Sequence, residues 1–435
     1  MARLFGTDGI RGLANGDVLT PELALAVARS AARVLGGKSV AIGRDTRPSG
    51  AMLQAAAAAG FTAEGAEVQL LGVVPTPTVA HVVASGAVDL GLVISASHNP
   101  VQDNGLKFFG PGGHKLTDAE EDAIEAGLEV RGGGVTGAEV ARVRDADDDL
   151  VEGYLRALLA TAGSLEGLTV VVDGAQGAAS RLAPELYRRA GATVVAIHAD
   201  ADGDHINEGC GATHPESLAA AVVEHGADLG IAHDGDADRC IVVDARGQVL
   251  NGDQVLGLLA LARQETGQPG SDVLVATVMS NLGLVQAMTA AGIAVVRTAV
   301  GDRYVLEAML AGDHRLGGEQ SGHVVMLDHA TTGDGLLTAL QLMDRVARSG
   351  RSVAELASVV TLLPQVLLNV RADRSRAVAP DVLAAVAGEE AGLAGSGRVL
   401  LRPSGTEPLV RVMVEAPSQQ VADEVAQRLA AVVAG

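Results

Sequence analysis

Residues 93–100 read Val-Ile-Ser-Ala-Ser-His-Asn-Pro, and they join an apolar segment to a polar loop. The run at 90–94 is typical of a buried strand, and Pro100 closes the loop that follows it. In α/β proteins the loops at the carboxyl ends of strands carry ligands and chemistry. The stretch therefore predicts an α/β fold with Ser97 and His98 at a functional sheet edge. A turn of ordinary polar residues is the alternative.

Strand-like runs alternate with helix-like segments through most of the chain. Such alternation is typical of parallel sheets with helical crossovers. In the first block we expect strands at 39–42, 68–74 and 90–94 and helices at 50–64 and 118–128. In the second we expect strands at 168–172, 193–197, 229–232 and 240–243 and helices at 178–190 and 217–226. In the third we expect strands at 273–278 and 294–298 and helices from 253 and at 281–291, 302–311 and 335–349.

Three successive blocks of similar size and order suggest a structural triplication. The fourth block differs, because it combines strands at 366–370, 398–401 and 409–415 with helices at 380–390 and 418–433. The sequence therefore predicts an α/β protein with three similar mixed α/β units, helices on both sheet faces, and a smaller C-terminal α+β domain. We expect domains at 1–150, 151–250, 251–362 and 363–435, with the active site in the central cleft.

The composition argues against several classes of protein. A formal net charge of -21 at pH 7 is unfavourable for binding nucleic acid or an anionic membrane, since both require a basic face. Any anion site must therefore be locally basic. Only two cysteines, Cys210 and Cys240, and a start without an apolar leader favour a cytoplasmic protein. The uncharged stretch 273–296 has the pattern of strand, helix and strand, so we reject a membrane span.

Residues 234–239 read Asp-Gly-Asp-Ala-Asp-Arg and place three carboxylates two residues apart. In an extended conformation such side chains point to one side. Three hard oxygen ligands suit Mg²⁺. A calcium-binding EF-hand loop is rejected, because Arg239 and Ala245 stand where that loop needs Gly and Glu. The alternative is an acidic solvated turn.

Residues 402–408 read Arg-Pro-Ser-Gly-Thr-Glu-Pro, and Arg411 follows. Arginine offers a planar fork for phosphate oxygens, and hydroxyls and glycine amides can add donors. The segment therefore predicts a phosphate cradle, and a hairpin with a surface Arg is the alternative.

Residues 317–323 read Gly-Gly-Glu-Gln-Ser-Gly-His. Glu319 and Ser321 are two residues apart and can face one pocket together, which suits sugar hydroxyls. A flexible surface hairpin is the alternative. Two further candidates are Arg11 in the Gly-rich segment 5–12 and Lys107, which follows Ser97 by ten residues. A partly desolvated Lys beside cations can lose its proton and act as acid or base. Solvated surface side chains are the alternatives for both.

Taken together, these loops resemble the α-D-phosphohexomutase family. Ser-Ala-Ser-His-Asn-Pro, Asp-Gly-Asp-Ala-Asp-Arg, Gly-Glu-Gln-Ser-Gly-His and Arg-Pro-Ser-Gly-Thr-Glu-Pro occur in this order, and the similarity runs from Phe5 to Arg411. The resemblance implies that Ser97 carries a covalent phosphoryl group. It implies one Mg²⁺ held by Asp234, Asp236, Asp238 and an oxygen on Ser97. The other implied roles are acid and base for Lys107 and His323, sugar recognition for Glu319 and Ser321, phosphate binding for Arg402, Ser404, Gly405, Thr406 and Arg411, and a basic lining from Arg11, His98 and Arg239.

The residue sequences of the third and fourth loops resemble those of the phosphoglucosamine mutases within this family. That resemblance implies interconversion of glucosamine 6-phosphate and glucosamine 1-phosphate through a phosphoserine enzyme and a bisphosphorylated sugar, in the supply of UDP-N-acetylglucosamine for the cell wall. It implies a hexosamine phosphate substrate, a hexose bisphosphate activator or a kinase for the first phosphorylation, and a monomer or homodimer. The alternatives are a phosphoglucomutase or phosphomannomutase, a sugar phosphatase, and a non-catalytic sugar-phosphate-binding protein. Intact Ser97, Lys107 and acidic residues argue against the last.

Overall fold

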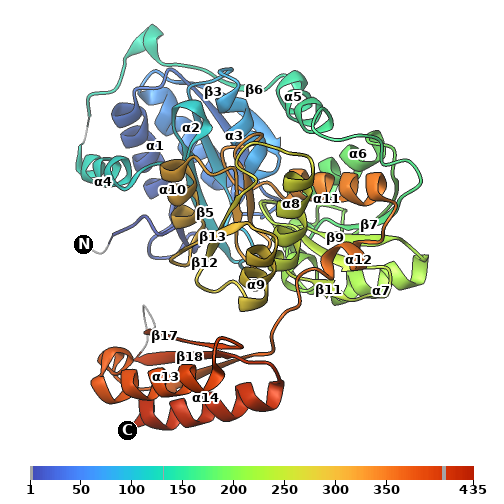
Figure 1. Ribbon diagram of the computed structural model, residues 1–435. Coiled ribbons are helices and arrows are strands. Elements are labelled where there is room, and N and C mark those ends of the chain that lie inside the picture. Colours follow the sequence, from blue (N-terminus) through green and yellow to red (C-terminus); the bar gives the residue numbers. More distant parts are fainter. Residues whose placement is uncertain (1–2, 131, 404–407) are drawn as a thin grey trace. The chain divides into compact units, whose positions relative to one another are not determined.

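The computed structural model describes residues 3–130, 132–403 and 408–435. These residues form two compact units (Figure 1). The first comprises Met1–Met279 and Ile293–Ser358, and the second comprises Ser280–Gly292 and Val359–Gly435. In the part of the chain that the structure describes, no helix is both long and apolar enough to cross a membrane.

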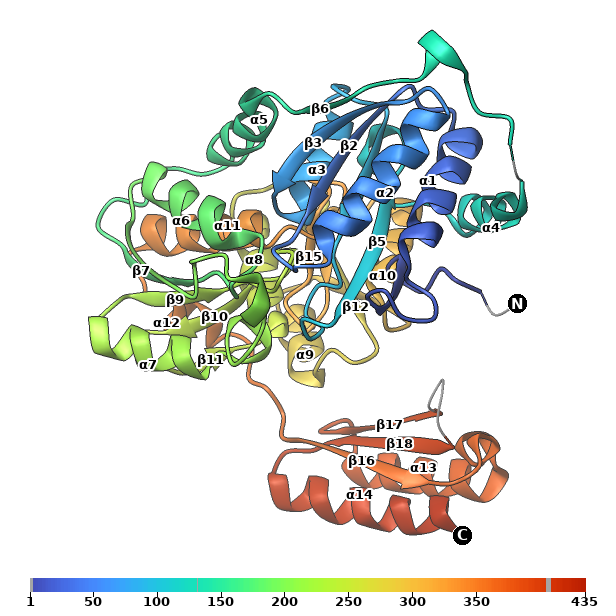
Figure 2. The same cartoon turned by 180° about the vertical axis from the view of Figure 1, so that it is seen from behind.

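The first sheet belongs to the first unit and carries helices on both faces. Its strands run in the order β1 (Ile10–Leu13), β5 (Asp103–Phe109), β4 (Leu90–Ile94), β2 (Ser39–Arg44), β3 (Glu67–Val73) and β6 (Val143–Asp145). Helices α1 (Pro21–Leu35) and α2 (Gly50–Ala63) lie side by side (Figure 2) and share a core with Val40 and Ile42. Helix α3 (Thr76–Ala84) covers the other face, where a Cβ on Gly91 would lie 2.8 Å from Val79. Glycine on this face thus allows a close approach of helix and sheet.

The second and third sheets complete the first unit. The second runs β11 (Val249–Leu250), β10 (Ile241–Asp244), β9 (Leu229–Ala232), β7 (Thr169–Asp173) and β8 (Thr193–Ile197). The third runs β13 (Ala294–Thr298), β12 (Val273–Thr277), β14 (Leu316–Gly318) and β15 (Val324–Met326). The remaining α-helices of this unit are α4 (Asp118–Ala126), α5 (Asp148–Leu159), α6 (Ala179–Arg189), α7 (Glu216–His225), α8 (Gly252–Glu265), α10 (Asp302–Gly312), α11 (Gly335–Ser349) and α12 (Val353–Ala357).

The three sheets repeat one arrangement of four strands. The orders β3-β2-β4-β5, β8-β7-β9-β10 and β13-β12-β14-β15 each contain three parallel strands followed by one antiparallel strand. This repeat confirms the structural triplication. The predicted parallel strands are present in each sheet, and a fourth, antiparallel strand joins them because the chain returns to it through a loop rather than a helical crossover. Strand β5 was missed altogether.

The triplication places the predicted loops at equivalent positions. Residues 95–102 join β4 to β5, residues 233–240 join β9 to β10, and residues 319–323 join β14 to β15. Each loop therefore follows the carboxyl end of the third parallel strand of its sheet, the position where open α/β sheets bind ligands. Three of the four predicted motifs are the same loop in three copies of one unit.

The second unit contains the C-terminal α+β domain. Its antiparallel sheet runs β16 (Gln365–Arg371), β18 (Leu409–Glu415) and β17 (Arg398–Pro403). Helices α13 (Pro380–Leu393) and α14 (Gln419–Ala434) share an apolar core with this sheet that includes Val382, Val410, Val412 and Leu429. Helix α9 (Leu282–Ala290) belongs to the same unit, where its Leu282 N–H donates to Glu415 Oε2 at 2.8 Å.

Candidate active site

Ser97 is buried directly after β4 and its hydroxyl faces the acidic loop. Its side-chain Oγ donates to Asp234 Oδ2 at 2.6 Å and lies 3.3 Å from His98 Nδ1. The Ser97 backbone has a φ of 54°, in the left-handed region that residues with a Cβ seldom occupy. Burial, with Arg239 and Arg11 nearby, lowers the pKa of His98 to about 4. Because the single hydroxyl proton of Ser97 is given to Asp234, His98 Nδ1 lies beside Ser97 Oγ as a second polar contact.

Asp234, Asp236 and Asp238 converge in the loop between β9 and β10. All three are buried, and their ligand atoms lie within 4.8 Å of one another. The convergence was predicted, but the predicted extended conformation was wrong. Ala237 has a φ of 58°, and its N–H donates to Asp234 O at 3.0 Å, so a tight turn brings the carboxylates together.

The electrostatics of this cluster favour a bound cation. Burial and the neighbouring carboxylates of Asp238 and Asp236 raise the pKa of Asp234 to about 8. Burial and then Asp236 raise the pKa of Asp238 as well. One oxygen of Asp236 and one of Asp238, Oδ1 in both, are buried without a hydrogen-bond partner among the described residues. Three buried carboxylates with unpartnered oxygens fit a hard divalent cation, so this cluster could hold a metal ion.

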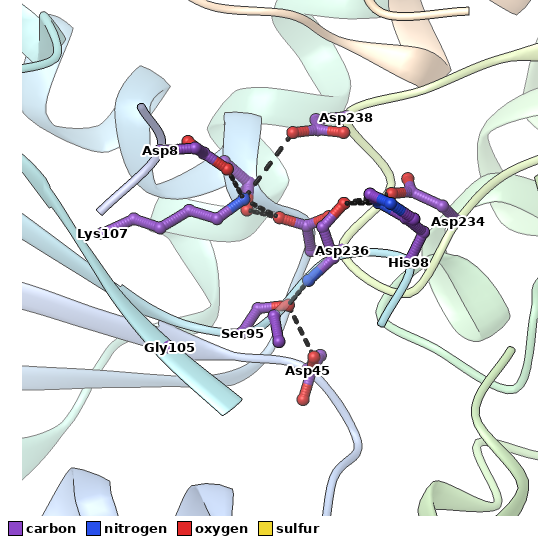
Figure 3. A network of polar contacts seen from close by, with 12 residues as sticks. Asp8, Asp45, Ser95, His98, Gly105, Lys107, Asp234, Asp236 and Asp238 are labelled. Atoms are coloured by element: carbon purple, nitrogen blue, oxygen red, sulfur yellow. Dashed lines mark hydrogen bonds and ion pairs between the residues drawn. The ribbon is translucent and has the colours of Figure 1, made fainter. Parts of the chain in front are cut away.

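Lys107 lies on β5 and is held between carboxylates. Its Nζ is 2.7 Å from Asp236 Oδ2, 2.8 Å from Asp8 Oδ2 and 3.7 Å from Asp238 Oδ2 (Figure 3). Burial acts to lower the pKa of Lys107, but these carboxylates raise it well above its ordinary value. In the same contact, burial acts to raise the pKa of Asp236 and Lys107 brings it well below the usual range. This geometry keeps Lys107 charged, whereas the sequence suggested an easily deprotonated lysine.

A cavity of about 330 Å³ opens beside these loops. It is lined by residues from the domains of all three sheets, and Arg11, Arg239 and His323 lie there among the carboxylates of Asp8, Asp238, Asp302 and Glu319. Arg239 Nε and both ring nitrogens of His323 are buried without a hydrogen-bond partner among the described residues. Arg239 Nε and His323 Nε2 lie 3.8–4.0 Å from carboxylates of Asp234, Asp238 and Asp302, so they can still accept a ligand oxygen as a hydrogen-bond partner. The lining residues are Leu4, Gly6, Thr7, Asp8, Gly9, Arg11, His98, Asp238, Arg239, Gly301, Asp302, Glu319 and His323.

The loop at 319–323 presents Glu319 and His323 to the cavity. The N–H of Gly301 donates to Glu319 Oε1 at 3.0 Å. The loop is a turn, since the N–H of Gly322 donates to Glu319 O at 3.0 Å. Ser321 does not line this cavity, and its Oγ is buried without a hydrogen-bond partner among the residues that the structure describes.

An ion-pair network beside the cavity was missed in the sequence. Lys115 Nζ is 2.8 Å from Asp8 Oδ1 and also pairs with Asp302 at the start of α10. Asp8 pairs with Arg11 as well. Burial acts to lower the pKa of Lys115, but Asp302 and Asp8 raise it above its ordinary value. Asp8 lies in the same Gly-rich segment, 5–12, as the predicted site residue Arg11. Nothing in the sequence around Lys115 or Asp302 indicates that these two residues belong to the site.

The predicted phosphate cradle lies in the second unit. Arg402 on β17 stands directly opposite Arg411 on β18 in the strand register. Like charges opposed across a sheet are unfavourable unless an anion or a counter-charge offsets them. The predicted residues Ser404, Gly405 and Thr406 lie outside the described residues.

Four family models match successive parts of the chain. All describe phosphoglucomutase/phosphomannomutase: α/β/α domain I matches residues 2–131, domain II residues 152–247, domain III residues 251–362 and the C-terminal domain residues 367–432. The chain belongs to the phosphoglucomutase/phosphomannomutase family. The family resemblance drawn from the four loops is therefore confirmed.

Full-length relatives narrow the position of this phosphohexomutase within the family. A phosphoglucosamine mutase of Saccharopolyspora erythraea is 59% identical over 442 residues, which cover 100% of the chain and 99% of that relative. A phosphoglucosamine mutase of Frankia alni is 58% identical over 449 residues, with 100% and 98% covered. The similarity thus spans all four domains of the family.

Solved structures share the fold of this phosphohexomutase. A phosphoglucomutase/phosphomannomutase family protein of Burkholderia thailandensis superposes with a TM-score of 0.82 at 25% identity, covering 99% of this chain and 97% of the other. The N-acetylphosphoglucosamine mutase of Aspergillus fumigatus, solved with GlcNAc-6P and magnesium, has a TM-score of 0.70 at 18% identity, covering 99% and 95%. The predicted class of three mixed α/β units and a small C-terminal domain is confirmed.

Proposed function

We propose that this phosphohexomutase interconverts glucosamine 6-phosphate and glucosamine 1-phosphate. The observation that carries the proposal is the buried Ser97 hydroxyl, which donates to the acidic cluster, beside a cavity lined by His98, Arg11, Arg239 and His323. The names of the full-length relatives support the amino sugar as substrate. The reaction would supply precursors of UDP-N-acetylglucosamine for the cell wall.

The proposed reaction transfers a phosphoryl group from Ser97 and later returns another. The bond between Ser97 Oγ and phosphorus breaks as O1 of glucosamine 6-phosphate bonds to that phosphorus. The O1 proton passes to a base, and an acid gives a proton to the departing Ser97 Oγ. The bisphosphate then turns over in the site. Its 6-phosphoryl group moves to Ser97 Oγ, whose proton passes to a base, while an acid gives a proton to O6 and glucosamine 1-phosphate leaves. Positioning and charge neutralisation supply most of the rate enhancement in such transfers.

The residues of the site suit these steps. Asp234, Asp236 and Asp238 would hold Mg²⁺, which when bound neutralises charge on the transferring oxygens. His323 and Lys107 form the proposed acid and base pair, with His323 directly on the cavity. Arg11, His98 and Arg239 would line the phosphate path, and Glu319 with Ser321 would bind sugar hydroxyls. Arg402, Ser404, Gly405, Thr406 and Arg411 would hold the phosphate that is not reacting.

Domain boundaries and partners complete the proposal. We place the phosphoserine, metal-binding, sugar-recognition and phosphate-binding domains at 1–150, 151–250, 251–362 and 363–435, near the limits of the four family models. A hexose bisphosphate or a kinase would phosphorylate Ser97 first. We propose a cytoplasmic monomer or homodimer.

The substrate assignment predicts a preference measurable by kinetics. With equal Mg²⁺ and bisphosphate activator, kcat/KM should be highest for glucosamine 1-phosphate among the 1-phosphates of glucosamine, glucose and mannose. A ratio of kcat/KM values is the proper measure, since specificity is differential binding of the transition state. Equal or faster turnover of glucose 1-phosphate would assign a phosphoglucomutase and leave the site roles unchanged.

The proposed cradle predicts a symmetric defect in Arg402→Ala. Loss of a charged bidentate contact should lower kcat/KM for both the 1-phosphate and the 6-phosphate substrate, by an amount that corresponds to about 2–5 kcal/mol of transition-state stabilisation. The matched control is Arg428→Ala, because Arg428 pairs with Glu389 on a helix of the same unit and should not affect turnover. A defect confined to one substrate would contradict a cradle that serves both orientations.

A further inference from the structure

Arg47 lies in the segment between β2 and α2, with its side chain completely buried. Its Nε donates to Asp45 Oδ2 at 2.9 Å. The two terminal nitrogens donate to backbone carbonyls of the loop that carries Ser97: Nη2 to Ser97 O at 3.0 Å and to Asn99 O at 2.7 Å, and Nη1 to Asp103 O at 2.9 Å and to Pro100 O. All five donors of the guanidinium are therefore used.

Asp45 connects Arg47 to the other end of the same loop. Its Oδ2 also accepts a hydrogen bond from Ser95 Oγ at 2.6 Å, as Figure 3 shows. Ser95 Oγ in turn accepts from the N–H of Ser97 at 2.9 Å. The N–H of Ser97 is thus fixed through Ser95 and Asp45, and its carbonyl is fixed by Arg47. The N–H and the carbonyl of Ser97 are therefore both held by the buried ion pair of Arg47 and Asp45, the N–H through Ser95 and the carbonyl directly.

Ser97 needs this support because of its backbone conformation. A φ of 54° is unfavourable for serine and persists only where the surroundings determine it. The Asn207 amide adds a further hydrogen bond to Ser97 O at 2.9 Å. In this conformation Ser97 Oγ donates to Asp234 Oδ2 at 2.6 Å. A relaxed loop would move the hydroxyl away from the acidic cluster.

We propose that Arg47 is a positioning residue for phosphoryl transfer. Its guanidinium binds four carbonyls of the 97–103 segment at once and so holds the phosphorylated Ser97 in line with the acceptor hydroxyl. The proposal rests on the proposed phosphoserine function. A lysine cannot replace this arginine, because an ammonium has three donors and lacks the planar fork. A displacement of about 1 Å at a reacting group can lower the rate about 100-fold.

The test compares Arg47→Lys with Arg263→Lys. Arg263 is also a buried arginine that pairs with a carboxylate, Asp328 at 2.7 Å, and donates to a carbonyl, Pro269 O at 3.0 Å, but it lies outside the phosphoserine loop. For each variant one measures the melting temperature, kcat and KM, and the phosphorylated fraction by intact mass. The rate at which water hydrolyses the phosphoserine is measured in the absence of sugar.

We expect Arg47→Lys to lower kcat per phosphorylated enzyme about 100-fold, with KM for the sugar phosphate within about threefold of the wild type. Arg263→Lys should change neither kcat nor KM, even if its melting temperature falls as much as that of Arg47→Lys. Equal loss of kcat in both variants, or wild-type kcat per phosphorylated Arg47→Lys enzyme, would overturn the proposal.

Two further measurements keep the proposal testable. If Arg47→Lys does not fold, Ser95→Ala removes the hydroxyl that accepts the Ser97 N–H, and it should also lower kcat while KM is retained. Wild-type kcat in that variant would overturn the proposal. Phosphoserine hydrolysis does not depend on which sugar is the substrate. An altered hydrolysis rate in Arg47→Lys therefore supports the positioning role even where the amino-sugar assignment fails, whereas absence of any phosphoserine in the wild type refutes the proposed function itself.

Discussion

Ser97→Ala should abolish mutase turnover while leaving the protein folded. The substitution removes the hydroxyl that accepts and returns the phosphoryl group, and no step of the proposed reaction can bypass it. The variant keeps the same Cβ at the same left-handed φ, so the loop retains its backbone requirement. The lost hydrogen bond to the buried Asp234 should cost about 1–3 kcal/mol of folding free energy, a modest fraction of the stability of a large domain.

The measurement combines turnover, melting temperature and intact mass. Wild-type protein should lose the mass of one phosphoryl group on phosphatase treatment, and Ser97→Ala should show no such change. Ser30→Ala is the matched control, because Ser30 is equally buried in the first unit but donates only to Ile124 O. Full activity is expected of that control. Phosphate mapped to Ser95 instead of Ser97 would show that the nucleophile is misassigned.

Asp236→Asn should lower turnover by roughly 100- to 1,000-fold, and removal of divalent metal should do the same to the wild type. Asp236 supplies a buried carboxylate with one oxygen that has no hydrogen-bond partner among the described residues. An amide at this position removes one negative charge from the cluster that would hold the metal ion. The same change leaves Lys107 Nζ without its nearest carboxylate. Both effects weaken the stabilisation of the transferring phosphoryl oxygens.

Asp244→Asn is the matched control for the metal prediction. Asp244 is a buried aspartate at the far end of β10, and it accepts hydrogen bonds from the N–H groups of Arg246 and Gln248 within one turn. This control can lose stability but should keep its rate per folded enzyme and its metal dependence. Rates that stay unchanged in excess chelator would exclude a metal requirement.

The sequence alone determined the positions of many strands and of the polar loops that follow three of them. The strands predicted at 90–94, 193–197, 229–232, 294–298 and 409–415 have those bounds in the structure. Apolar runs closed by polar loops are visible locally, because side-chain periodicity and turn residues act over a few neighbours. The three equivalent loops were therefore identified before their equivalence was known.

The tertiary structure alone decided which charged groups meet. Strand β5 begins with Asp103, Asn104 and Gly105, which have no strand pattern of their own, and it forms because β1 and β4 pair with it on either side. Lys107 owes its charge to carboxylates on two other segments. Likewise Lys115 meets Asp302 across 187 residues, and Arg47 reaches Ser97 O across 50. Such contacts depend on the packing of distant segments. Burial and pairing with distant carboxylates determine the charge and the orientation of these side chains, and neither burial nor pairing can be deduced from the local sequence.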